Sequence, residues 1–221
     1  RASRTVPYIS KVTGVPMVDL ASRVMVGQSL RSLGYGTGLH AAPPYYAVKV
    51  PVFSFEKLAD ANSYLGPEMK STGEVLGIGK TLAEALFKGL TSAGILLRAP
   101  ADHAIGVLIS VEDHDRHEIL KIAKKLDDMG MTLYATPDTA DAIRRLGIVV
   151  ETVHDIKEGG EAYRLLESGR ISYIVYTGAA YDGTLDDYTA LHRRAQQLAI
   201  ACLTSLDTAN ALADIFASRY N

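Results

Sequence analysis

The second half of the chain alternates between short apolar runs and amphipathic stretches. Between the first two runs, apolar residues from Ile119 to Leu126 recur at the spacing of one helix face. Alternation of this kind is typical of βαβ units, so it predicts an α/β fold with a doubly wound, parallel, five-stranded sheet. The predicted strands cover residues 105–111, 132–135, 148–153, 172–176 and 199–203.

Polar residues mark the starts of two of the helices that this pattern predicts. Asp115 and Glu118 have the spacing of an N-terminal capping pair for the helix that follows the first strand. Thr136 before Pro137 has the pattern of a cap and a first-turn proline. The second of these helices is predicted to close at Gly147.

The first part of the chain is less periodic. A glycine-rich loop is expected at 34–42, and a linker containing Pro100 at 98–103. We therefore predict two units, residues 1–98 and 104–221. Within the first unit, the pattern predicts a helix, a strand and a second helix at 15–26, 45–55 and 81–90.

Composition narrows the classes of function. The formal net charge is −2 and no lysine-rich run occurs, so the basic surface of a nucleic-acid-binding protein is absent. No stretch approaches the ~20 apolar residues that a membrane helix needs, and no signal peptide opens the chain. The single cysteine, Cys202, fits a reducing compartment. We predict a cytoplasmic protein that binds neither nucleic acid nor membrane.

Charge is divided unevenly along the chain. Residues 1–98 contain 11 Lys and Arg against 6 Asp and Glu, whereas residues 99–221 contain 12 against 19. This asymmetry supports two separate units. The chain begins with Arg1 rather than Met, and we interpret it as a piece of a longer protein.

Several long segments carry a resemblance to a known family. In the first unit these are RASRTVPYISKVTGVPMVDLA from Arg1, PPYYAVKVPVFSF from Pro43 and LGPEMKSTGEVLGIGKTLAEALFK from Leu65. They resemble the large subunit of carbamoyl-phosphate synthase, in the order found there. ISVEDHDR, LYATPDTADAIRRLGI, IKEG and DDYTALHRRA in the second unit resemble the methylglyoxal-synthase-like (MGS-like) domain that ends this subunit. The resemblance implies an α+β remnant of an ATP-grasp domain followed by an allosteric domain.

The resemblance also implies a ligase that makes carbamoyl phosphate from bicarbonate and glutamine-derived ammonia, with ATP and Mg²⁺ as cofactors. It implies two partners, the small glutaminase subunit and the rest of the large subunit. In the family the Mg²⁺ ligands lie immediately before the position of Arg1, so we expect no catalytic or metal-binding residue in this fragment. Arg1 is expected near the synthetase site, and the fragment alone is expected to be inactive. The competing class is a free-standing metabolite-binding module.

Hydroxyl groups cluster where the predicted strands end. In open α/β sheets, ligands bind beyond the carboxyl ends of strands, where helix N-termini offer N–H groups to anions. Ser and Thr are also preferred helix caps, whether or not a ligand binds. Together with the resemblance, this reasoning gives an effector site of Ser110, Arg116, Thr136, Thr139, Lys157, Thr177 and Thr204.

The expected effector is a small molecule, either a nucleotide monophosphate or an amino acid. The resemblance implies that a phosphate sits in the turn after the second strand. Here Pro137 removes an N–H donor from that turn, Asp138 adds a carboxylate, and Asp155 stands where a basic residue is usual. Like charge at a phosphate site is costly, so a cationic or neutral effector, or lost regulation, stays open.

A rival interpretation makes the second unit a lyase like methylglyoxal synthase. Gly159, Gly160 and Glu161 resemble the glycine pair and acidic residue of that enzyme, with Glu161 as the base and Asp186 near the position of the enzyme's second carboxylate. The altered turn at Pro137 leaves little to hold a substrate phosphate. We therefore favour a regulatory domain.

Overall fold

The later part of the chain forms a five-stranded parallel sheet. The computed structural model describes residues 5–54, 67–95, 105–177 and 185–220. The sheet in the later part of the chain has the strand order β5-β4-β3-β6-β7, and all its strand pairings are parallel. The predicted fold class is therefore confirmed. The strands are β3 (Gly106–Ser110), β4 (Thr132–Ala135), β5 (Val150–Thr152), β6 (Tyr173–Tyr176) and β7 (Ala201–Leu203).

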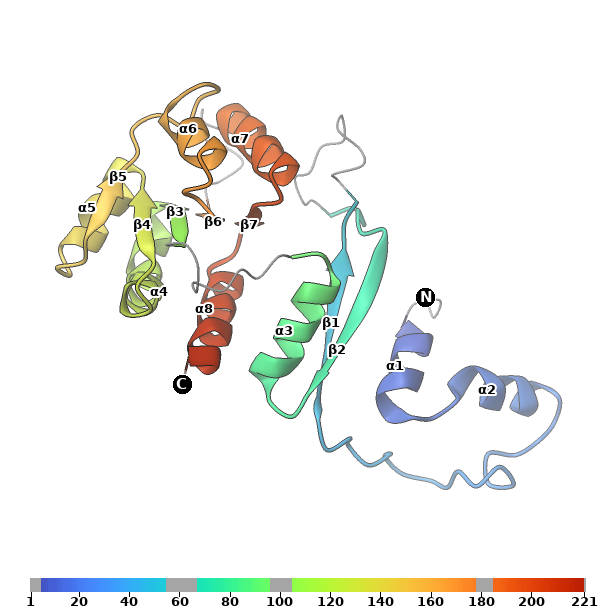
Figure 1. The fold of residues 1–221 in the computed structure, drawn as a ribbon. Coiled ribbons are helices and arrows are strands. Elements are labelled where there is room, and N and C mark those ends of the chain that lie inside the picture. The colour runs from blue at the N-terminus through green and yellow to red at the C-terminus, as the bar shows by residue number, and fades with distance from the viewer. Residues whose placement is uncertain (1–4, 55–66, 96–104, 178–184, 221) are drawn as a thin grey trace.

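Helices cover both faces of this sheet (Figure 1). The buried apolar residues of α4, α5 and, apart from Ile215, α8 share one hydrophobic cluster, and those of α6 and α7 share the other. Successive residues of β3 alternate between the clusters: Val107 and Ile109 belong to the first, and Leu108 to the second. The helices are α4 (Arg116–Asp128), α5 (Pro137–Arg144), α6 (Glu161–Glu167), α7 (Leu185–Gln197) and α8 (Leu206–Tyr220).

The strand order places a topological switch point in the middle of the sheet. From β3 the chain first builds outward through β4 and β5, and then returns to the other side of β3 for β6 and β7. Connections after β3 and β6 therefore diverge, which opens a crevice at their carboxyl ends. The hydroxyl groups predicted from strand ends belong to this edge of the sheet.

The earlier part of the chain is an antiparallel hairpin with three helices. Strand β1 (Tyr46–Val52) pairs with β2 (Gly73–Gly79), and α3 (Leu82–Ser92) packs on the hairpin. Helices α1 (Thr5–Thr13) and α2 (Met17–Met25) precede it. The hydroxyl of Tyr45 donates to the carbonyl of Val12 (2.5 Å), which joins α1 to the start of β1.

Helix α3 begins with a capping box and lies very close to β2. Thr81 Oγ1 accepts from the Glu84 N–H (3.2 Å), and Glu84 Oε2 accepts from the Lys80 N–H (2.7 Å). A Cβ atom at Gly77 would lie 2.0 Å from the carbonyl oxygen of Ala85. Only glycine at that position allows the helix to approach the strand so closely.

Several sequence-based expectations need correction. The pattern predicted neither α1 nor β2, and the predicted helix over 15–26 is α2, two residues shorter at its start. Asp115 stands at the N-cap of α4 but makes no capping hydrogen bond with its side chain, because the short 3₁₀ helix η2 (Asp113–Asp115) precedes α4 directly. Thr136 likewise occupies the N-cap of α5 without a side-chain cap, although Pro137 is the first helical residue as predicted.

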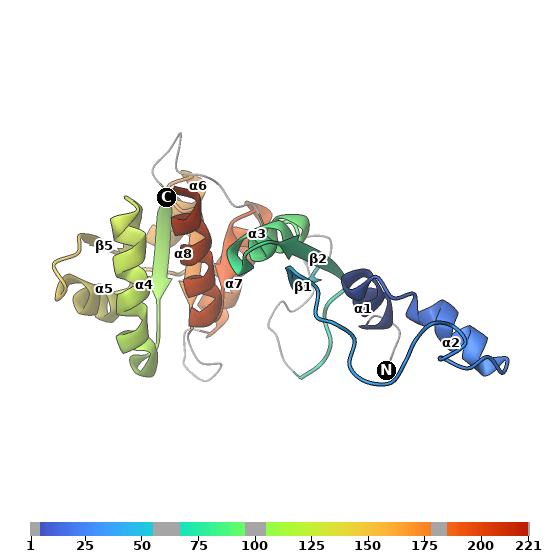
Figure 2. The same cartoon turned by 90° about the horizontal axis from the view of Figure 1, so that it is seen from below.

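The predicted linker at 98–103 lies outside the described residues, and so does Phe55, the end of the strand predicted over 45–55. Among the described elements, the main contact between the two predicted units joins α3 to α8, which Figure 2 shows side by side. None of the described helices has the length and apolar character required to span a bilayer.

Candidate functional site

A cleft of about 320 Å³ opens at the carboxyl ends of β6 and β7, beside the loop that follows β3. Thr177 follows β6 directly, and Thr204 and Ser205 connect β7 to α8. Two of the predicted effector residues, Thr177 and Thr204, therefore line one cavity. The complete lining is Asp115, Glu118, Thr177, Thr204, Ser205, Leu206 and Asp207.

Three carboxylates face this cleft at helix N-termini. Asp115 and Glu118 lie at the start of α4, and Asp207 lies in the first turn of α8. A negative side chain at this end of a helix interacts favourably with the helix dipole. The chain's own carboxylates thus add negative charge to the cleft, beside helix N-termini that would otherwise attract a phosphate. The arrangement suits a ligand that carries an amino group and hydrogen-bonding atoms.

A second group of predicted residues forms a hydroxyl network between β3 and β4. Thr136 Oγ1 donates to Ser110 Oγ (3.1 Å) and lies 3.4 Å from Thr139 Oγ1. Thr139 Oγ1 also accepts from the Val111 N–H (3.2 Å), and Thr139 is only 1% exposed. The network fixes the first turn of α5 to the loop after β3. A structural role accounts for Thr139, because its hydroxyl is buried and already bonded within the chain.

Arg116 is neutralised beside this network. Its guanidinium lies 2.5 Å from a carboxylate oxygen of Asp113 and 3.1 Å from one of Asp138. The carboxylate of Asp138, which the sequence placed near an expected phosphate, therefore has a cationic partner from the chain. To bind a ligand, the guanidinium of Arg116 would have to give up its contacts with Asp113 and Asp138.

Thr177 connects the hydroxyl network to the cleft. Its Oγ1 accepts from the Glu112 N–H (3.4 Å), in the same loop that carries Val111 and leads to Asp115. A ligand that bonded Thr177 would therefore contact the loop after β3 and the end of β6, which are the two sides of the switch point.

Lys157 lies apart from these two groups. It belongs to the turn between β5 and α6, where its N–H donates to Asp155 Oδ1 (2.9 Å) and its carbonyl accepts from the Gly160 N–H (2.8 Å). Four inter-strand spacings of about 4.8 Å each separate β5 from β7. The structure thus brings Thr177 and Thr204 together and sets Ser110, Arg116, Thr136 and Thr139 beside them. Lys157 does not line the cleft and lies in the connection that follows β5, the edge strand opposite β7. Arg1 lies outside the described residues.

The residues proposed for lyase chemistry have structural partners. Glu161 Oε2 accepts from the His154 N–H (2.9 Å), which ties the first turn of α6 to the end of β5. A Cβ atom at Gly160 would lie 2.6 Å from the Asp155 carboxyl carbon, so the glycine serves the turn itself. One carboxylate oxygen of Glu161 is therefore engaged with the backbone.

An aromatic stack backs the end of β6. Tyr176 stacks on Tyr188 of α7 (ring centroids 3.4 Å apart), and Tyr188 stacks on His192 (5.8 Å). Burial raises the pKa of Tyr188 and lowers the pKa of His192. Burial also raises the pKa of the Cys202 thiol on β7, so this cysteine stays protonated and unreactive. The stack holds Tyr176, and with it the neighbouring Thr177, in place.

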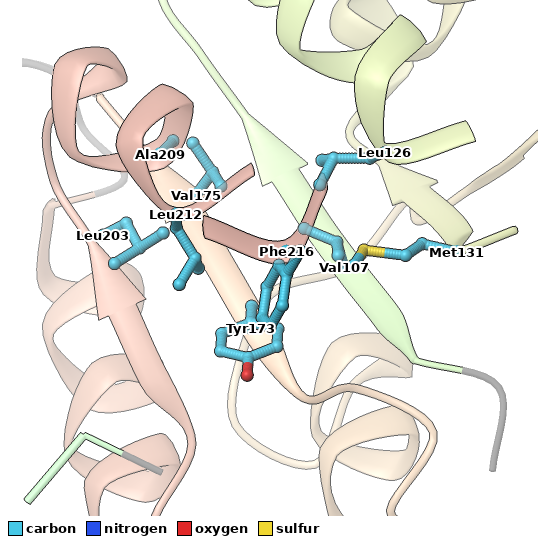
Figure 3. A pocket seen from close by; sticks show the side chains of 9 residues that line it. All are labelled: Val107, Leu126, Met131, Tyr173, Val175, Leu203, Ala209, Leu212 and Phe216. Carbon is cyan, nitrogen blue, oxygen red and sulfur yellow. The ribbon is translucent and has the colours of Figure 1, made fainter. Parts of the chain in front are cut away.

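A small apolar void of about 10 Å³ lies between α8 and the sheet. Figure 3 shows the side chains that converge on it, among them Phe216 from α8 and Tyr173 from β6. Its apolar lining offers no partner for a water molecule. This void is a packing gap beneath α8, and the polar cleft is the candidate binding site.

Sequence reasoning missed the acidic lining of the cleft. Asp115 and Glu118 were interpreted as caps, and Asp207 was not singled out. A signal was present, because Asp207 stands three residues after Thr204, in the first turn of a helix that starts at the predicted edge. Within the described residues, no group of three or more His, Cys, Asp or Glu side chains is arranged to hold a metal ion.

Part of the second unit is similar to a known domain family. Residues 118–204 match the family described as the MGS-like domain. Over nearly its whole length, the chain is similar to the C-terminal part of carbamoyl phosphate synthase large chains. It is 45% identical over 216 residues to that of Clostridium botulinum (strain Langeland) and 43% identical to that of Clostridium perfringens (strain 13). Both alignments cover 97% of this chain and 20% of the relative.

These relatives confirm the family resemblance that the sequence motifs carried. The chain spans about a fifth of the length of the relatives it matches. Among solved structures, a methylglyoxal synthase from Elizabethkingia anophelis matches with a TM-score of 0.41 and 16% identity, over 50% of this chain and 77% of that one.

Proposed function

We propose that the chain is the C-terminal part of the large subunit of a glutamine-hydrolysing carbamoyl-phosphate synthase. Residues 1–98 complete an ATP-grasp lobe, and residues 104–221 form its allosteric domain. The observation that carries this proposal is the identity of 43–45% over 97% of the chain, which includes both units. The parent enzyme is a cytoplasmic ligase that serves pyrimidine and arginine synthesis.

The ligands of the parent reaction lie mostly outside this chain. ATP and Mg²⁺ are held by residues upstream of Arg1, and the partners are the rest of the large subunit and the small glutaminase subunit. The isolated chain is therefore expected to consume no ATP when given bicarbonate and ammonia. Reading the gene upstream of Arg1 tests the assignment directly: an in-frame Glu-x-Asn-Pro supports it, and a start codon there overturns it.

The cleft binds the allosteric effector in this proposal, and its charges favour an amino acid with a cationic side chain over a nucleotide monophosphate. Asp115, Glu118 and Asp207 repel a phosphate and attract an ammonium group. For two unit charges 4 Å apart at a protein surface, this interaction is about 4 kcal/mol in either direction. Thr177 and Thr204 supply hydroxyls that discriminate by hydrogen bonding.

Calorimetric titration of the assembled synthase with ornithine, arginine, UMP and IMP tests this preference. We expect one of the two amino acids to bind, and Asp207→Asn to weaken that binding by about tenfold, which corresponds to roughly 1.4 kcal/mol. Lys157→Ala is the matched control, because Lys157 does not line the cleft, and this variant is expected to bind the amino acid normally. Nucleotide binding that is lost in Lys157→Ala and kept in Asp207→Asn would contradict the assignment.

The lyase alternative is tested separately. Because Glu161 is bonded to the His154 backbone and the Pro137 turn lacks a donor, we expect no methylglyoxal from dihydroxyacetone phosphate. Turnover abolished by Glu161→Gln would overturn this expectation.

A further inference from the structure

Helix α8 begins in the candidate effector cleft. Thr204 and Ser205 lead into the helix, and Leu206 and Asp207 are its first two residues. Four of the seven residues that line the cleft therefore belong to α8 or to its entry. A ligand in the cleft contacts the N-terminal turn of this helix directly.

One face of α8 rests on the sheet of the second unit. Leu206, Ala209, Leu212, Ala213 and Phe216 all belong to the hydrophobic cluster that α8 shares with α4 and α5. The apolar void lies under this face, against Ala209, Leu212 and Phe216 (Figure 3). The interface between α8 and the sheet is thus not completely packed. Side chains beside a void lack part of their van der Waals contacts.

A different side of α8 faces the first unit. Ile215 is only 1% exposed, yet it belongs to neither hydrophobic cluster of the second unit. The element of the first unit that contacts α8 is α3, and Figures 1 and 2 both show the two helices side by side. Among the buried apolar residues of α8, Ile215 is therefore the one that lies outside both clusters, on a helix that also contacts α3. Helix α3 is in turn fixed to β2 by the close approach at Gly77.

The other carboxylate-bearing helix of the cleft also leads to α8. Asp115 and Glu118 lie at the start of α4, and Lys125 in the same helix donates to Asn210 Oδ1 (2.7 Å) and Asp214 Oδ1 (2.6 Å) of α8. Among the main contacts between described elements, α4 has none with the first unit. Displacements on either side of the cleft therefore converge on α8.

We infer that α8 is the element through which occupancy of the cleft is communicated to the synthetase unit, with Ile215 at the point of transfer to α3. The inference rests on the proposed function, because it presumes an effector in the cleft. Coupling between two sites requires that the ligand bind two states of the protein with different affinity. The first turn of α8 lies in the cleft, and its side contacts α3. The position of α8 can therefore differ between two such states while the sheet stays unchanged.

The test uses the assembled synthase with ornithine as the probe, or with arginine if arginine is the amino acid that binds. The coupling is measured as the ratio of the probe's Kd without and with a non-hydrolysable ATP analogue and Mg²⁺, and reciprocally as the effect of the probe on analogue binding. In the wild type we expect a ratio of about 5-fold or more. Ile215→Ala is expected to bring the ratio to within about twofold of 1, and Ile215→Val to an intermediate value. The probe's Kd without nucleotide is expected to change less than about twofold, because Ile215 does not line the cleft.

Ile143→Ala is the matched control. Ile143 is fully buried in α5, a helix whose main contacts are with β4, β5 and α4. The same truncation there is expected to lower the melting temperature while leaving the coupling ratio at its wild-type value. Ile215→Val is the milder variant if Ile215→Ala fails to assemble.

The outcomes separate the two proposals. If the wild type binds neither amino acid, the proposed effector site is wrong and the inference fails with it. If the wild type binds the probe with coupling and the Ile215 variants keep the full ratio, the inference alone is wrong. A loss of coupling in Ile143→Ala equal to that in Ile215→Ala would also overturn it, because general destabilisation would then be the cause.

Discussion

The two predicted units differ sharply in how they bury apolar side chains. In the described part of 105–220, strands and helices share two continuous hydrophobic clusters. In 5–54 and 67–95, the buried hydrophobic residues are Leu20, Val50 and Ala85. Large apolar side chains stand exposed there instead, at Val18, Val24, Met25, Val26, Leu30, Leu39, Tyr46, Met69 and Leu82.

This difference shows that helical pattern and burial are separable. Helix α2 has apolar residues on one side, yet Val18 and Val24 on it are 60% and 41% exposed. A helix of nine residues is marginal without tertiary packing. The described part of the first unit therefore buries few apolar side chains, whereas the second unit has two hydrophobic clusters of its own.

The largest expected effect comes from separating the units. Residues 104–221 alone are expected to melt in one cooperative transition, because both hydrophobic clusters lie within them. Residues 1–98 alone are expected to show no cooperative transition by circular dichroism. Sharp melting of the 1–98 piece would abolish the contrast between the units.

The next effect compares two apolar truncations. Leu108→Ala removes a side chain that is 2% exposed in the central strand and is expected to cost about 2–5 kcal/mol of unfolding free energy. Val24→Ala removes a side chain from the exposed face of α2 and is expected to change stability by less than about 0.5 kcal/mol. Denaturant melts of the whole chain measure both. Equal costs would mean that α2 is packed as firmly as the sheet.

A third effect tests the one tightly packed contact of the first unit. Gly77→Ala places a Cβ atom 2.0 Å from the Ala85 carbonyl oxygen and 2.6 Å from the Gly89 nitrogen, so α3 must move away from the hairpin. We expect a loss of about 3 kcal/mol, the upper end for overpacking. The measurement is amide exchange of α3. Gly73→Ala is the control, since its nearest contact would be an ordinary 3.8 Å, and comparable exchange in both variants would argue against close packing.

The same contrast explains how far the sequence was predictive. In the second unit, periodicity reflected burial, so every predicted strand is present and the class of fold was correct. In the first unit, β2 is rich in glycine and α1 contains Pro7 and β-branched residues, so neither has the composition of its element. Gly77 and Gly79 are in the strand because α3 lies against them, which is a tertiary cause that no local pattern expresses.

For the candidate site, the sequence predicted the edge of the sheet but not how its residues are arranged there. Strand ends located Thr177 and Thr204 correctly at one edge, because parallel strands place their carboxyl ends together. The sequence did not reveal which hydroxyls were already used, such as that of Thr139, or that Lys157 follows β5, the edge strand opposite β7. These two features depend on which strands are neighbours in the sheet. The hydrophobic pattern of each single strand does not determine the order of the five strands.

The smallest expected effect is a dependence on pH that belongs to the second unit. Burial lowers the pKa of His192 below its usual value of 6.5, so the unfolded chain binds a proton more readily than the folded one. Stability is therefore complete above about pH 6.5 and falls as the pH drops below it, by at most about 1.4 kcal/mol per pH unit. Thermal melts of residues 104–221 between pH 7.5 and 5.5 measure this slope.

The variant His192→Gln is expected to flatten the dependence of stability on pH. The control His117→Gln, at an exposed position on α4, is expected to leave it unchanged. If His192→Gln keeps the full slope, the acid sensitivity arises outside the aromatic stack with Tyr176 and Tyr188. The burial of His192 against β6 would then not be the cause of the pH dependence.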